Sequence, residues 1–161
     1  MTRKRPWNRT DQPVYSISSV DNMGNYNMNM ITYVTAVSMH PKRFICGVYE
    51  NTRTLTNLSG TSQFVLQLLH ENQYNLLSVL GRKSGNQVDK IRLFEKRNLL
   101  SEFSNFKILK EALAVIKMKV IHVMKGGDHT IFLCDVIEFE NLNDGKPLTL
   151  DILRDKKLIR I

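Results

Sequence analysis

The sequence predicts a mainly β protein: a small β-barrel with short helices inserted between its strands. Six or more short runs are rich in β-branched, aromatic and aliphatic residues, as strands prefer. Only two segments have helical spacing, so strands and helices do not alternate as they do in a doubly wound parallel sheet. Two late apolar runs, residues 113–124 and 130–139, flank a glycine-rich turn and predict a long β-hairpin.

The chain length of 161 residues fits one domain spanning residues 1–161. Apolar residues make up 42% and charged residues 24%, close to ordinary globular usage. This composition excludes a disordered, collagen-like or disulfide-stapled chain. Residues 1–12 carry three consecutive cations at positions 3–5 and are expected to form a flexible basic tail.

Three strands are predicted near the N-terminus. Residues 14–20 alternate loosely, residues 31–38 are β-branched and aromatic, and residues 44–49 follow a turn at positions 40–42. Between the first two, residues 21–30 are rich in Asn and Met around Gly24. Because Asn and Gly favour turns, a loop is expected there.

Helices are predicted in the middle of the chain. Residues 52–60 open with Thr and end in Gly, which is typical of a capped helix. Residues 63–69 form an apolar run that predicts another strand. Residues 69–81 show partly helical spacing and also end in Gly, and residues 86–91 fit either a short helix or a loop.

The net charge indicates an anionic partner. Lys plus Arg number 23 and Asp plus Glu 15, a formal charge of +8. Such an excess favours nucleic acid, an acidic surface or a phosphorylated small molecule. The cations grouped near the C-terminus are interpreted as a solvated chain end: Arg154, Lys156, Lys157 and Arg160.

Cys46 and Cys134 lie far apart among apolar residues and are predicted to be buried thiols in a reducing compartment. No Cys/His spacing typical of zinc occurs, so no metal is expected. The basic N-terminus is not followed by an apolar run, and no stretch approaches the ~18 apolar residues of a transmembrane helix. A cytoplasmic protein is therefore expected.

Hydroxyl groups mark the first candidate binding segment, residues 32–38. Thr32, Thr35 and Ser38 lie on a predicted strand that breaks at Pro41. Unpaired amides and hydroxyls at such a strand end suit a planar, acceptor-rich ligand. A half-buried, threonine-rich strand is the simpler explanation of the composition alone.

Two further segments suit an anion. Residues 51–54 stand at a strand-to-helix junction, where free amides, the helix dipole and Arg53 favour a phosphate. Residues 81–90 combine two glycines, two cations and Ser84 before Lys90, so their backbone can wrap an anion, although the Walker spacing is missing. An ordinary capped helix and a polar surface loop remain the alternatives.

His129 is the candidate for proton chemistry. It follows Asp128 at the hairpin turn, where a His can hydrogen-bond a ligand or donate a proton near neutral pH. A structural role beside Asp128 is the alternative. The sequence holds no nucleophile elbow, dinucleotide fingerprint or zinc-protease motif.

These segments, in this order, resemble the flavin reductase-like family of FMN-binding split β-barrels. The strongest match is GDHTIF at residues 127–132, which is similar to the family's G-D-H-[ST]-hydrophobic run after a long strand. Residues 27–49 resemble the family's Asn, hydroxyl-bearing strand, Ser, Pro and apolar strand. Residues 51–54 resemble its stretch before the first helix, and residues 81–90 its G-x-x-S-G-x-x-V-D-K segment.

The resemblance implies a Greek-key split barrel that forms a homodimer, with FMN at the subunit interface. It implies that strand residues lie along the edge of the flavin ring. It also implies that the helix start approaches the ribityl chain and phosphate, and that a glycine-containing loop completes the anion site. In that order, these residues are Thr32, Tyr33, Val34, Thr35, Ala36, Val37 and Ser38; Asn51, Thr52, Arg53 and Thr54; and Gly81, Arg82, Lys83, Ser84 and Gly85. His129 would lie near the flavin face in an orienting or proton-donating role.

The function implied by the resemblance is an NAD(P)H-dependent flavin reductase, with NADH or NADPH as hydride donor to the flavin. Two departures weaken the reductase part: Cys134 stands where the family often has Gly, and residues 146–161 lack an aromatic, glycine-containing ending. An FMN-binding electron-transfer module without a nicotinamide site therefore stays open. A basic nucleic-acid-binding β-barrel is a third alternative, but Phe44, Tyr49 and Phe64 lie in apolar runs that predict core.

Overall fold

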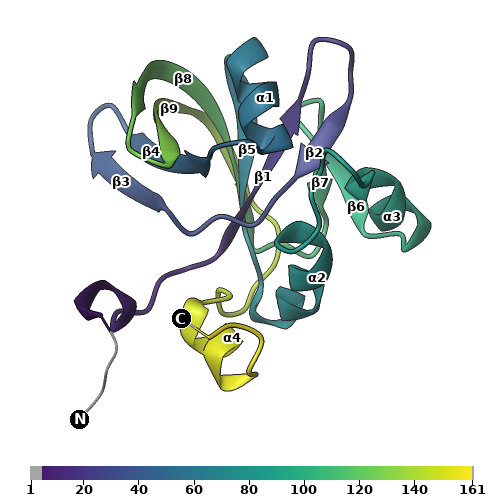
Figure 1. Cartoon of the computed structure of the whole chain (residues 1–161). Coiled ribbons are helices and arrows are strands. Elements are labelled where there is room, and N and C mark those ends of the chain that lie inside the picture. Colours follow the sequence, from purple (N-terminus) through teal and green to yellow (C-terminus); the bar gives the residue numbers. More distant parts are fainter. Residues whose placement is uncertain (1–4, 161) are drawn as a thin grey trace.

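The computed structural model describes residues 5–160 and confirms the mainly β fold class. Seven strands form one antiparallel sheet in the order β2-β1-β5-β8-β9-β4-β3, and β6 and β7 form a separate hairpin (Figure 1). The strands are β1 Tyr15–Val20, β2 Tyr26–Met28, β3 Val34–Ser38, β4 Arg43–Tyr49, β5 Gln63–Leu68, β6 Leu100–Phe103, β7 Phe106–Leu109, β8 Ala114–Lys125 and β9 His129–Asn141. The late hairpin predicted from the sequence is confirmed as β8 and β9.

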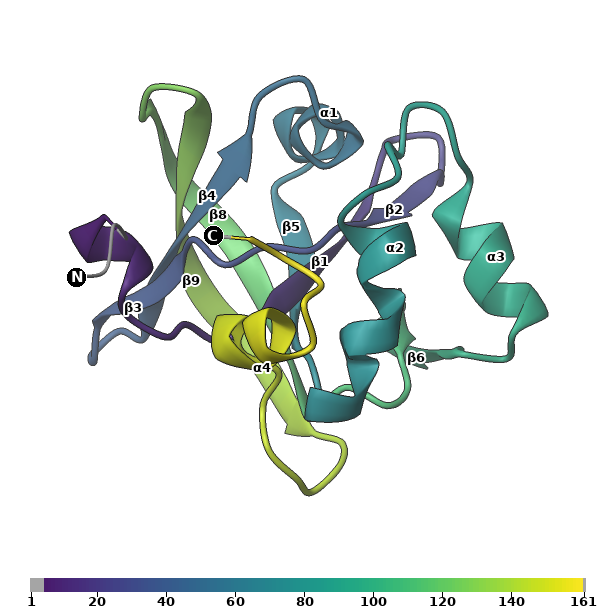
Figure 2. The same cartoon turned by 60° about the horizontal axis from the view of Figure 1, so that its bottom comes forward.

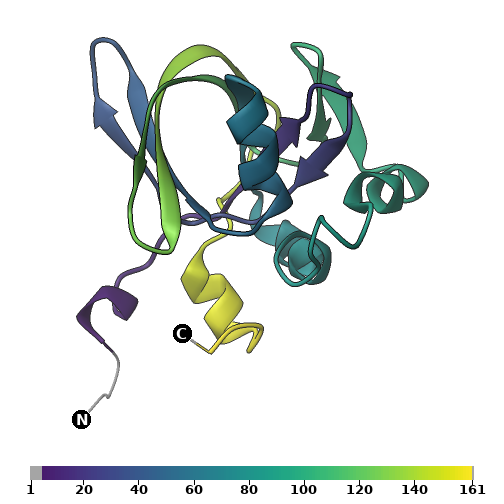
Figure 3. The same cartoon turned by 45° about the horizontal axis from the view of Figure 1, so that its top comes forward.

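The large sheet curls on itself, and helix α1 (Arg53–Gly60) lies across the opening. The register of the β8–β9 pair shifts twice, and such bulges bend and twist a strand. Helix α1 contacts β1, β2 and β4, so it bridges strands from both ends of the sheet order. Figure 3 shows α1 between the curled β8–β9 ribbon and the β1–β2 pair.

A second group of helices packs against one end of the barrel (Figure 2). They form a core of their own around the fully buried Leu69, Phe94 and Leu148, separate from the barrel core around Phe64 and Phe132. The helices of this group are the 3₁₀ helix η2 Glu71–Leu76, α2 Leu77–Leu80, α3 Lys90–Lys96 and α4 Leu150–Asp155. One further 3₁₀ helix, η1 Pro6–Asn8, lies near the N-terminus.

Several local predictions differ from the structure. The helix predicted over residues 69–81 begins at Glu71, because the His70 side chain accepts from the Asn72 amide and caps it, and it is divided into the 3₁₀ helix η2 and α2. The loop expected at residues 21–30 contains β2, whose Met28 is fully buried. The strand predicted from residue 31 begins at Val34, because Ile31 is bonded through both its backbone groups to Tyr15, at the other end of the sheet.

Both cysteines are buried free thiols, as predicted. Burial raises the pKa of both thiols, with neighbouring negative charge as the smaller cause, and that of Cys134 reaches about 12. Within residues 5–160, no helix is long and apolar enough to cross a membrane.

The expected flexible tail is partly anchored. Its first two cations, Arg3 and Lys4, lie outside the described residues. Gln12 accepts a hydrogen bond from the Leu150 amide through its carbonyl, and the Asp11 carboxylate accepts from the Asp151 amide, both at 2.9 Å. These bonds tie the end of the segment to the start of α4.

Candidate functional site

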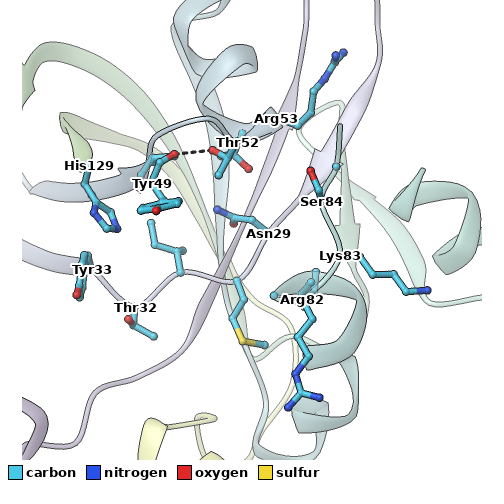
Figure 4. A pocket seen from close by; sticks show the side chains of 18 of the residues that line it. Asn29, Thr32, Tyr33, Tyr49, Thr52, Arg53, Arg82, Lys83, Ser84 and His129 are labelled. Atoms are coloured by element: carbon cyan, nitrogen blue, oxygen red, sulfur yellow. Dashed lines mark hydrogen bonds between the residues drawn. The ribbon is translucent and has the colours of Figure 1, made fainter. Parts of the chain in front are cut away.

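A cavity of about 470 Å³ opens between α1 and β4 on one side and the loop of residues 81–85 with α4 on the other. Its volume is in the range of sites that hold small molecules and cofactors. Figure 4 shows Thr52 and Tyr49 on one side of it, Arg82 and Thr32 on the other, and Asn29 pointing into the middle.

The structure brings most of the predicted site residues to this cavity. Those that line it are Thr32, Tyr33, Thr52, Arg53, Thr54, Gly81, Arg82, Lys83, Ser84, Gly85 and His129. Val34 and Thr35 line a neighbouring cavity of about 560 Å³ that shares Tyr33 and His129 with the first. The predicted residues that line neither are Ala36, Val37, Ser38 and Asn51. They lie elsewhere because β3 runs away from the cavity along β4, and Asn51 precedes the cavity-facing start of α1.

An aromatic group forms one end of the cavity. The His129 ring lies 4.8 Å from the Tyr33 ring and 5.2 Å from the Tyr49 ring, measured between centroids. His129 Nδ1 is 2.6 Å from an Asp128 carboxylate oxygen. Because an ionised carboxylate only accepts hydrogen bonds, Nδ1 carries the proton and Nε2 is the free acceptor of the neutral ring. Tyr49, predicted to be core, is 55% exposed and belongs to this wall, whereas Phe64 is core as predicted.

The start of α1 faces the cavity. Thr52 caps the helix: its hydroxyl accepts from the Leu55 amide and donates to the Tyr49 carbonyl. The capping hydroxyl fixes both the helix start and the strand end before it. The helix dipole therefore places partial positive charge at Arg53 and Thr54, which line the cavity.

We expect Thr52→Ala to lower the free energy of unfolding by about 1 kcal/mol, because an N-cap hydroxyl is lost. Thr52→Ser keeps the hydroxyl and is expected to stay near the wild-type value. Urea unfolding of the two variants measures the difference. Equal stabilities for Thr52→Ala and wild type would contradict the capping role.

The opposite end of the cavity contains a buried amine. Lys90 is 4% exposed, lines the cavity, and donates from Nζ to the Leu80 carbonyl at 3.0 Å. Burial lowers the pKa of this amine to about 8. Since an ammonium group has three hydrogens, it retains donors for a ligand.

Three predicted phosphate-binding cations point away from the cavity centre in Figure 4. The Arg53 guanidinium is paired with Asp21 at 2.6 Å. Arg82 donates to the Leu158 carbonyl at 2.6 Å, and Lys83 is exposed. These side chains contribute charge near the cavity, whereas Lys90 is the cation buried in its wall.

Sequence reasoning missed several lining residues. Asn29 stood in a presumed loop, although its Oδ1 accepts from the Ile17 amide at 2.8 Å and fixes the cavity floor to β1. Lys90 was visible in the V-D-K segment but not chosen as a site residue. Arg154, interpreted as part of a solvated chain end, lines the cavity with a side chain only 11% exposed.

The positive charge of the cavity wall favours an anionic ligand. Among the described residues that line the cavity, five are Lys or Arg, and none is Asp or Glu. Together with the aromatic end, this arrangement suits an elongated ligand with a planar head and an anionic tail. Fold and cavity thus define the class: a β-barrel with a basic, partly aromatic cavity of a size that suits a phosphorylated, ring-containing small molecule.

Comparison with known families agrees with this class. The family model described as "Flavin reductase like domain" matches residues 7–155. The chain belongs to this family, as its motifs indicated. A search among curated proteins found no match.

Solved structures share the fold. Flavin reductase PheA2 superposes with a TM-score of 0.73 at 21% identity, covering 89% of this chain and 87% of that one. An FMN-binding protein from Thermus thermophilus, with bound 1-cyclohex-2-enone, gives 0.75 at 21% identity, covering 91% and 84%. A larger protein from Sinorhizobium meliloti 1021 gives 0.76 at 17% identity; 89% of this chain is covered but only 48% of that chain.

Proposed function

We propose that this chain binds FMN and acts as an NAD(P)H-dependent flavin reductase. The observation that carries the proposal is the cavity itself: none of its described lining residues is Asp or Glu, an aromatic group lies at one end, and the buried Lys90 amine lies at the other. The family membership supports flavin as the ligand. The similar fold of the flavin reductase PheA2 and of the T. thermophilus FMN-binding protein supports the same function.

The residues present fit FMN. Ser84 and Lys90, together with the amides at the start of α1, would hold the phosphate through charge-assisted hydrogen bonds. Gly85 lets the loop approach Asn27 closely, because a Cβ built there would lie 2.8 Å from Asn27 Cγ. The ring would lie toward Thr32, Tyr33 and His129.

Bound FMN would supply a ring that accepts a hydride from a reduced nicotinamide and passes its electrons to an acceptor. The chain's own residues orient and shield that ring. Tyr33 and Tyr49 hold the His129 imidazole in place, and the Asp128 carboxylate fixes its tautomer. His129 can thus offer Nε2 to a ligand, or a proton from that atom once the ring is protonated.

We further propose a homodimer formed through the exposed parts of β3, β8 and β9. Large apolar side chains are exposed on β3, β8 and β9: Val37, Ile121, Val123, Met124, Ile137 and Phe139. Exposed apolar groups of this kind mark interaction surfaces. Phe139 is 70% exposed on β9.

For the wild-type protein, light scattering is expected to give twice the mass of one chain. Phe139→Lys is expected to shift the protein toward monomer, because it places a charge in the apolar interface. Met23→Lys, at a position in the β1–β2 turn that is also highly exposed, serves as the control and should stay dimeric. A wild-type protein that is monomeric at micromolar concentration would overturn the dimer.

The absorption spectrum of the purified protein tests the function. Flavin bands, with FMN as the chromophore released on denaturation, are expected, as is bleaching on anaerobic addition of NADH or NADPH. If FMN is bound but neither donor bleaches it, the proposed reductase activity is overturned, and an FMN-binding electron-transfer module is the function that remains. A colourless protein that ignores added FMN would overturn flavin binding and make nucleic acid the next ligand to test.

A further inference from the structure

The N-terminal segment of the described chain borders the aromatic end of the cavity. Asn8 and Gln12 both line the cavity. Gln12 also lines the neighbouring cavity, to which Tyr33 and His129 belong. The segment therefore lies at the end of the site where the proposed function places the flavin ring, and away from the end that would hold the phosphate.

Residues 5–10 form an arm that the rest of the fold holds only at its C-terminal side. Within the described part of the chain, the hydrogen bonds of these residues join members of the arm alone, such as the bond from the Asn8 amide to the Arg5 carbonyl at 2.9 Å. Bonds to other elements begin at Asp11, whose carboxylate accepts from the Asp151 amide. Figures 1 and 3 show η1, in purple near the N-terminus, standing apart from the barrel. The arm can therefore move about the anchored residues that follow it.

The arm carries an exposed aromatic side chain. Trp7 is 67% exposed, and it is the only tryptophan in the sequence. The Arg5 guanidinium lies over its ring, 5.8 Å from the centroid. Covering an exposed indole is favourable, and its face suits stacking on a planar ring. Because Trp7 directly precedes Asn8 in the cavity wall, a small movement of the arm brings the indole to a ligand there.

The Asn8 side chain offers a polar contact beside the indole. It is half-buried and lines the cavity. Among the residues that the structure describes, its side-chain amide has no hydrogen-bond partner. A primary amide has both N–H donors and a carbonyl acceptor. The polar edge of a flavin ring, where an N–H group lies between carbonyls, presents the complementary groups.

We propose that residues 5–10 are a lid that closes over the flavin ring when the cofactor binds, with Trp7 stacked on the ring and Asn8 hydrogen-bonded to its polar edge. This inference rests on the proposed function. The ligand that closes the lid is a planar ring system with donors and acceptors on its edge. A phosphate without a ring would occupy the opposite end of the cavity and leave the lid open.

Limited digestion with trypsin tests the closure, because Arg9 is exposed on the arm. Cleavage after Arg9 is expected to be roughly fivefold slower, or more, in the FMN-loaded protein than in the unliganded protein, since cleavage follows the population of the open form. Saturating inorganic phosphate should not slow it. Lys42, exposed in the β3–β4 turn and in the lining of neither cavity, is the control bond and should be cleaved at an unchanged rate. No protection at Arg9, or equal protection at Lys42, would overturn the lid.

Substitution of the indole tests its contact with the ring. In a fluorescence titration, Trp7→Ala should raise the dissociation constant of FMN roughly tenfold, whereas Trp7→Phe keeps an aromatic face and should stay near wild type. Met23→Ala, at a position that is 87% exposed, is the control and should bind as wild type does.

The outcomes separate the lid from other roles of the arm. Because Trp7 is exposed, Trp7→Ala should leave the free energy of unfolding of the unliganded protein unchanged in urea. Wild-type FMN affinity in Trp7→Ala would overturn the lid. A Trp7→Ala protein that is monomeric where the wild type is dimeric would assign the arm to a subunit interface and also overturn it. A wild-type protein that binds no flavin fails the proposed function itself.

Discussion

Gly85→Ala is expected to weaken FMN binding roughly 100-fold while the protein stays folded. The new Cβ would lie 2.8 Å from Asn27 Cγ, closer still to Asn27 Oδ1, and 3.0 Å from Arg53 Cβ. Asn27 cannot easily yield, because it is buried and donates from Nδ2 to the Thr54 hydroxyl at 2.9 Å. The loop that carries Ser84 must therefore move away from the start of α1, which opens the phosphate site.

Fluorescence titration of the unliganded protein with FMN measures the effect of Gly85→Ala. Gly60→Ala is the matched control, because its Cβ would meet Asn22 Nδ2 at an ordinary 3.5 Å. The cause is tested by Asn27→Ala, which removes the obstructing side chain. In the Gly85→Ala/Asn27→Ala double variant, the loss of FMN binding free energy should be smaller than the sum of the losses in the two single variants, since both substitutions act through one contact. Wild-type FMN affinity in Gly85→Ala would remove the loop from the site.

The strands that could be predicted are those with a strong local pattern. The β8–β9 hairpin combines long apolar runs with a glycine turn, and β4 combines apolar residues with a preceding Pro. The short β6 and β7 carry too few residues for a pattern, and the fourth helix, α4, depends on its cap at Thr149 and on the buried Leu153. Such elements are determined by tertiary packing, which the local sequence does not contain.

For the site, the sequence located the segments but not the directions of their side chains. Arg53 and Arg82 stand in the predicted loops, yet their guanidinium groups are bonded to Asp21 and to the Leu158 carbonyl, 32 and 76 positions away. Arg154 had the opposite outcome, because long-range contacts, among them the bonds between α4 and the N-terminal segment, bring it to the cavity. Local motifs therefore find where a ligand site lies, whereas distant partners decide which cation serves it.

Replacement of the buried Lys90 amine is expected to raise the stability of the unliganded protein but to weaken FMN binding. Its folded pKa of about 8 lies below its ordinary value of 10.5, because burial disfavours the ammonium form. Below pH 8, the stability of the unliganded protein is therefore reduced by the full cost of burying the charged amine. This stability should rise as the pH increases from about 8 to 10.5. Lys90→Met should remove this pH dependence and raise the free energy of unfolding at pH 7 by about 1 kcal/mol, less than the full pKa shift would give because the Leu80 carbonyl loses its donor.

Binding of FMN should respond to Lys90 in the reverse direction. The phosphate is dianionic above its second pKa of ~6, and it requires the charged amine. Wild-type FMN affinity should thus fall as the pH rises through 8, while Lys90→Met should bind roughly 10- to 100-fold more weakly at pH 7 with a flatter pH profile. Riboflavin, which lacks the phosphate, and Lys83→Met, whose exposed amine points away from the cavity, are the controls and should show neither change. Titrations between pH 6.5 and 9 test this; a Lys90→Met protein with wild-type FMN affinity, or one less stable than wild type at pH 7, would show that the buried amine supports the fold rather than the phosphate.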